Sequence, residues 1–190
     1  MLERYKNNDT IMHIGGTNFQ EGIKYGDADY YFSSIAHVWG WASWRRAWKK
    51  YDYAIKDVFE FIRNDSLKYY GYNIEERIYW YEKMRDTYYG KINTWDYQWN
   101  YCLWKNRGLG IIPQVNLISN IGFGENATHT QYQTKWANMP TQILNVTEHP
   151  KKIECNIIAD SYTFQNHHNQ SLNAPLSKKI INRIKRIFSA

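Results

Sequence analysis

The chain has few cysteines, few prolines and no long hydrophobic run. Cysteine occurs only at Cys102 and Cys155, and proline occurs four times in 190 residues. Two cysteines cannot build the disulfide framework of a small secreted domain, so a reducing compartment, the cytoplasm, is expected. No apolar stretch approaches the roughly 20 residues that a membrane-spanning helix needs. These absences predict a soluble or peripheral protein.

Aromatic residues and positive charge are abundant instead. Nine tryptophans, 17 tyrosines and 7 phenylalanines bring the aromatic content to 17%. Amphipathic rings of this kind fill cores and line clefts. The formal net charge of +6 favours anionic partners. Because the basic residues concentrate near the C-terminus and no RNA-binding aromatic motif occurs, we expect no nucleic-acid partner.

Short apolar runs alternate with helical patterns along the chain, which predicts an α/β fold. Residues 10–14, 109–113 and 115–119 read as short strands bounded by glycine or proline. The sequence Asn73-Ile74-Glu75-Glu76 is a capping-box pattern that opens a helix closed by Gly90.

A second helix is expected to follow Thr94 as its capping residue and to end near Gly108. Asp96 lies in its first turn between aromatic residues. A carboxylate among rings suits a general base that takes a proton from a sugar hydroxyl. Acidic residues also favour the first helical turn because of the helix dipole, so a purely structural role stays open.

The most aromatic segment is residues 31–48, which also contains His37 and the pair Arg45-Arg46. Its tryptophans are Trp39, Trp41, Trp44 and Trp48. Trp41, Trp44 and Trp48 have roughly helical spacing and fit a buried helix face with the arginines reaching water. The alternative is that the segment forms the wall of a sugar-binding cleft in which an arginine holds a diphosphate.

A glycine-rich turn, residues 122–129, contains Glu125 and His129. Backbone N–H groups of such a turn can approach a phosphate, and an imidazole beside a carboxylate can complete a divalent-metal site. One histidine and one carboxylate are a weak metal signal, so an exposed turn histidine is the alternative.

Three strings, taken in order, carry a family resemblance. They are residues 31–48, the string Thr94-Trp95-Asp96-Tyr97-Gln98-Trp99, and residues 116–130. Over about residues 1–150 the chain resembles a bacterial family of nucleotide-diphospho-sugar transferases, the family 2-type or hemolytic-protein-like glycosyltransferases found with surface-polysaccharide genes.

The resemblance implies the C-terminal, acceptor-side part of a GT-A domain, a Rossmann-like fold. The nucleotide-binding strands and the acidic metal-binding motif of such enzymes precede the segment with which this chain starts. The complete enzyme would transfer a sugar from a nucleotide-diphospho-sugar donor to a cell-surface glycan acceptor, with Mn²⁺ or Mg²⁺ as cofactor. The alternative is a non-catalytic remnant that binds carbohydrate or a membrane surface.

The resemblance also assigns roles to residues. Asp96 becomes the candidate general base, and Glu125 and His129 become candidates to face donor phosphate or metal. The expected substrate-binding residues are His37, Trp39, Trp41, Arg45, Gln98 and Trp99.

Three regions are expected along the chain. Residues 1–150 form the acceptor-side domain, residues 151–175 a polar segment, and residues 176–190 a basic amphipathic helix. Such a helix either lies on an anionic membrane surface or covers the core of its own domain. The first possibility predicts a location in the cytoplasm at the inner face of the membrane.

Overall fold

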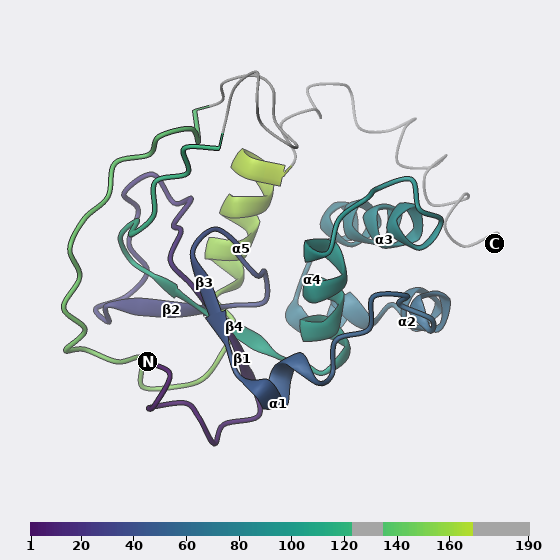
Figure 1. Cartoon of the computed structure of the whole chain (residues 1–190), viewed down its shortest axis with the longest axis horizontal. Helices are drawn as coiled ribbons and strands as arrows, with labels where there is room; N and C mark the ends of the chain where they lie inside the picture. Colours follow the sequence, from purple (N-terminus) through teal and green to yellow (C-terminus); the bar gives the residue numbers. More distant parts are fainter. Residues whose placement is uncertain (123–134, 169–190) are drawn as a thin grey trace.

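The computed structural model describes residues 1–122 and 135–168, in which helices flank a four-stranded sheet (Figure 1). The strand order is β2-β4-β1-β3. Strands β1 (Ile11–Gly15) and β4 (Leu109–Pro113) lie at the centre and are parallel. Strands β2 (Tyr30–Ser33) and β3 (Trp41–Ser43) pair antiparallel with their neighbours at the two edges. The α/β class expected from the sequence is confirmed as a mixed α/β architecture.

Two of the three expected strands are present, as β1 and β4. The third, residues 115–119, is not a strand. The Asn116 side chain explains the difference, because its amide donates to the carbonyls of Ile118 and Pro140 at 2.8 and 2.9 Å. An asparagine bonded to nearby backbone groups offers the chain an alternative to a strand ladder.

The described residues contain five α-helices and two other helical turns. They are α1 (Arg45–Trp48), α2 (Val58–Arg63), the 3₁₀ turn η1 (Ser66–Tyr70), α3 (Ile74–Tyr88), α4 (Asp96–Lys105), α5 (Ile157–Thr163) and the π-helical η2 (Phe164–His168). The capping box of α3 is confirmed. Glu76 donates its backbone N–H to the Asn73 side chain at 3.0 Å, and Asn73 donates its own to Glu76 at 2.8 Å.

Helices cover both faces of the sheet. Tyr30, Phe32 and Ile111 belong to the main core, which they share with residues of α2, α3 and α4. Their chain neighbours Tyr31 and Ile112 pack with Ala159 of α5. Because successive residues of a strand point to opposite faces, α5 lies on the face opposite α2, α3 and α4.

Helix α5 is fixed to the end of β2 by a buried carboxylate. Asp160, only 1% exposed, accepts hydrogen bonds from the Ser33 hydroxyl, the Ser34 hydroxyl and the Ser34 N–H. Burial raises the pKa of this carboxyl, and these donors oppose the shift. Part of the expected polar segment 151–175 is therefore α5 and η2, packed onto the sheet.

Several predicted features lie outside the described residues, namely Glu125, His129, residues 169–175 and the basic segment 176–190. Within the described ranges, none of the helices combines the length and apolar character that crossing a bilayer requires.

Candidate functional site

Four tryptophans from three parts of the chain meet beside β3. We call Trp41, Trp48, Trp95 and Trp99 the tryptophan surface. The ring of Trp41 stacks on that of Trp95 with centroids 5.3 Å apart. The ring of Trp99 lies 5.7 Å from Trp41 and 5.1 Å from Trp48. Trp48 and Trp95 are 44% and 39% exposed, whereas Trp99 is fully buried. Trp99 thus forms the floor, and Trp48 and Trp95 present their rings to solvent.

A close contact of two glycine-containing turns places Trp41 here. Gly40 has a left-handed φ of 59°, and its carbonyl accepts the N–H of Gly16 at 2.8 Å. A Cβ on Gly40 would lie 2.3 Å from Ile118 Cδ1, so this position has room only for glycine. The turn directs β3 back along β1, where Trp41 stacks on His13 at 5.5 Å.

Of the two alternatives for the aromatic segment, the structure excludes a single helix face formed by Trp41, Trp44 and Trp48. Trp41 lies in β3, Trp44 is the N-cap residue of α1, and only Trp48 is helical. The reason is tertiary: pairing with β1 extends residues 41–43, although their spacing fits a helix.

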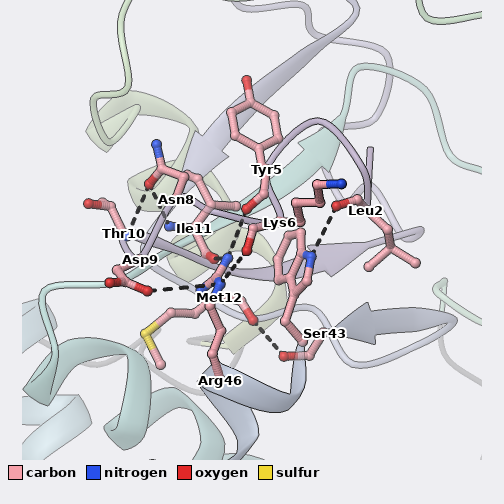
Figure 2. A network of polar contacts seen from close by, with 11 residues as sticks. Leu2, Tyr5, Lys6, Asn8, Asp9, Thr10, Ile11, Met12, Ser43 and Arg46 are labelled. Carbon is pink, nitrogen blue, oxygen red and sulfur yellow. Dashed lines mark hydrogen bonds and ion pairs between the residues drawn. The ribbon is translucent and has the colours of Figure 1, made fainter.

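A shallow hollow of about 270 Å³ lies against the tryptophan surface. Its lining is Trp41, Ala42, Ser43, Trp44, Arg45 and Trp48. The two arginines next to it behave differently. Arg46 donates to the carbonyls of Tyr5, Lys6 and Ile11 at 2.8–2.9 Å, and thereby ties α1 to the N-terminal turns (Figure 2). The Arg45 side chain makes no hydrogen bond, ion pair or ring contact with the described residues.

Asp96 lies next to Trp95 at the first position of α4. Its Oδ1 accepts the Thr94 hydroxyl and the Tyr97 N–H, the latter at 2.8 Å. Oδ2 accepts no hydrogen bond from the part of the chain that the structure describes. The N-cap residue is Trp95, without a capping side chain, so the expectation that Thr94 caps this helix is corrected by one residue. Thr94 positions the Asp96 carboxylate instead.

Gln98 is buried, 3% exposed, and its amide nitrogen donates to the Thr94 carbonyl at 2.7 Å. Its Oε1 is buried without a hydrogen-bond partner among the described residues. Gln98 therefore holds the start of α4 in place and does not line the hollow.

His37 lies in the interior, 4% exposed, and its Nδ1–H donates to the Thr17 carbonyl at 3.0 Å. Burial lowers its pKa to about 4. His13 is also neutral. Its Nδ1 accepts the Trp99 indole N–H, its Nε2–H donates to the His37 carbonyl, both at 3.1 Å, and burial lowers its pKa to about 3. These contacts connect the floor of the tryptophan surface to the loop after β2.

Trp39 packs into a different aromatic group. Phe19 lies at the centre of this group, 5.2 Å from Trp39, 4.9 Å from His37 and 3.9 Å from His167, measured between ring centroids. Two of the expected substrate-binding residues, His37 and Trp39, thus contact Phe19, whereas Trp41 and Arg45 line the hollow.

The expected metal residues Glu125 and His129 lie outside the described residues. In residues 1–122 and 135–168, no group of three or more histidine, cysteine, aspartate or glutamate side chains is arranged to hold a metal ion.

Sequence reasoning missed Trp48, Trp95 and His13 as members of the site. Trp48 and Trp95 belong to the aromatic strings of the sequence, but the spacing of tryptophans does not show which rings are exposed and which are buried. His13 stood inside an apolar strand, which gave no sign of its contact with Trp99. No family model, curated protein or solved structure matches this chain.

Proposed function

We propose that this chain binds a carbohydrate on the tryptophan surface, as the acceptor side of a glycosyltransferase that uses a nucleotide-diphospho-sugar donor. The observation that carries the proposal is the pair of solvent-exposed indoles, Trp48 and Trp95, around Trp41 and beside the hollow. Exposed indole rings stack well on the C–H faces of a sugar, and their N–H groups can donate hydrogen bonds to its hydroxyl oxygens.

In this proposal Asp96 is the general base. Its Oδ1 is held by Thr94 and Tyr97, which leaves Oδ2 to take the proton of an acceptor hydroxyl. The acceptor oxygen then forms its bond to the anomeric carbon of the donor, and the bond from that carbon to the nucleoside diphosphate breaks. The proton ends on Asp96 and the electron pair on the departing diphosphate.

The donor, the Mn²⁺ or Mg²⁺ cofactor and the GT-A fold of the complete enzyme belong to the same proposal. Support for them comes from the sequence resemblance and from the parallel pair β1 and β4, whose carboxyl ends are where α/β proteins commonly bind ligands. The proposed location is the cytoplasm, at the inner face of the membrane through residues 176–190.

A second candidate function is glycan binding without transfer. The observation in its favour is that Asp96 accepts the Tyr97 N–H in the first turn of α4. An acidic residue with a purely structural role at a helix start makes the same kind of hydrogen bond. The tryptophan surface serves this function without any donor.

Two measurements test these proposals. With the full chain, a glycan array should show binding that is lost in the double variant Trp48→Ala, Trp95→Ala, with the fold checked by circular dichroism. Failure to bind any glycan would exclude both functions. With the nucleotide-binding part of such an enzyme supplied upstream, sugar transfer from nucleotide-sugars to a bound glycan should occur and should be lost in Asp96→Asn while glycan binding remains. Glycan binding without any transfer by this extended chain would favour the second function.

A further inference from the structure

We infer that the carbohydrate bound on the tryptophan surface is acidic, a glycan bearing a carboxylate or a phosphate group next to the stacked sugar. The inference rests on the proposed function and names its substrate class. What carries it is the unpartnered Arg45 guanidinium in the lining of the hollow.

The neighbouring arginine shows what a structural role looks like here. Arg46 is 23% exposed, makes three hydrogen bonds to carbonyls and lies 4.6 Å above the ring of Trp44. Arg45 is exposed and has none of these contacts with the described residues. The contacts of Arg46 therefore give it a structural role, whereas Arg45 has no structural role among the described residues.

The acidic side chains close in sequence to the tryptophan surface accept hydrogen bonds from residues of their own segments. Asp52 accepts the backbone N–H groups of Ala54 and Lys56 at 2.9 and 3.2 Å. Asp96 accepts Thr94 and Tyr97 through Oδ1. Neither carboxylate pairs with Arg45. The exposed residues Lys49 and Lys50, which follow α1 directly, add further positive charge.

The chemistry of the guanidinium then selects the ligand. Its planar fork matches a carboxylate or phosphate through two parallel hydrogen bonds, and such charge-assisted bonds are about twice as strong as neutral ones. A neutral sugar would use the indole rings equally well but would give Arg45 only hydroxyl groups to contact. The rings therefore bind the sugar, and Arg45 selects the acidic one.

A paired glycan array tests this with the full chain. Each acidic oligosaccharide is printed beside its neutral counterpart, uronic acids beside their methyl esters and phosphorylated sugars beside dephosphorylated ones. The wild type should bind the acidic member about tenfold more tightly. The Arg45→Gln variant should lose this preference and keep its binding to the neutral member. Arg63→Gln, which removes an exposed arginine of α2 outside the hollow, is the matched control and should keep the preference.

The outcomes separate the two proposals. Equal binding of acidic and neutral members, or an unchanged preference in Arg45→Gln, overturns the acidic ligand and leaves carbohydrate binding intact. No binding to any glycan overturns both. Vesicles of phosphatidylglycerol, which offer phosphate without these sugars, form the last arm. Vesicle binding that equals binding of the acidic glycans, survives Trp48→Ala and is lost in Arg45→Gln shows that Arg45 recognises charge alone, and this overturns the inference.

Discussion

Mild acid should destabilise this protein strongly, because His13 and His37 are folded into the interior as neutral rings. Burial lowers their pKa values from 6.5 to about 3 and about 4. Below pH 6.5 the two histidines therefore bind protons in the unfolded chain but stay neutral in the folded chain. The stability that these residues contribute is fully present above pH 6.5 and falls as the pH drops below that value.

The size of the effect follows from the two pKa values. Between pH 7 and pH 5, a histidine that stays neutral in the folded state and titrates at 6.5 in the unfolded state costs about 1.9 kcal/mol. His13 and His37 together should lower the free energy of unfolding by about 4 kcal/mol, a large share of the 5–15 kcal/mol typical of a domain. Burial also lowers the pKa values of His167 and His168, so these two residues add to the loss. Carboxylates with ordinary pKa values near 4 contribute little in this window.

Urea unfolding at pH 7 and pH 5 measures this loss directly. In His37→Asn, an amide can still donate to the Thr17 carbonyl but does not titrate, so the loss between the two pH values should shrink by about 1.9 kcal/mol. The core variant Ile62→Val should be less stable at both pH values and keep the wild-type difference. A wild-type loss below about 1 kcal/mol would refute the reasoning. NMR of the ring protons checks it without a variant, because both rings should stay neutral at pH 5.

Three substitutions test local features of the fold by urea unfolding at pH 7. Asn73→Ala removes the confirmed capping box and should cost about 1 kcal/mol, whereas no loss would show that α3 does not depend on it. Arg46→Ala should cost about 2 kcal/mol because three carbonyls lose a charged donor, while Arg45→Ala should stay within about 0.5 kcal/mol. Gly40→Ala should cost more than about 1 kcal/mol, since its φ is left-handed and its Cβ meets Ile118; a neutral result would disprove the close contact.

Local chemistry made much of the fold predictable. The capping box needs only residues three apart, so Asn73 and Glu76 could be read directly from the sequence. The strands β1 and β4 are short apolar runs bounded by glycine or proline, and their boundaries follow from those residues. What could not be predicted is where pairing partners override a local pattern, as β1 does when it extends residues 41–43.

The candidate site shows the same division more sharply, because exposure is a property of the assembled fold. Trp95 and Trp99 are four residues apart on one helix start, yet the first is 39% exposed and the second fully buried. Trp99 is buried because its N–H donates a hydrogen bond to His13, a residue 86 positions away in the sequence, and because Trp41 and Trp48 cover its ring. Trp95 lies over Trp41 at the rim, where nothing among the described residues covers its outer face. The aromatic segment could therefore suggest a sugar-binding wall, but only the β1–β3 pairing decides which rings a sugar can reach.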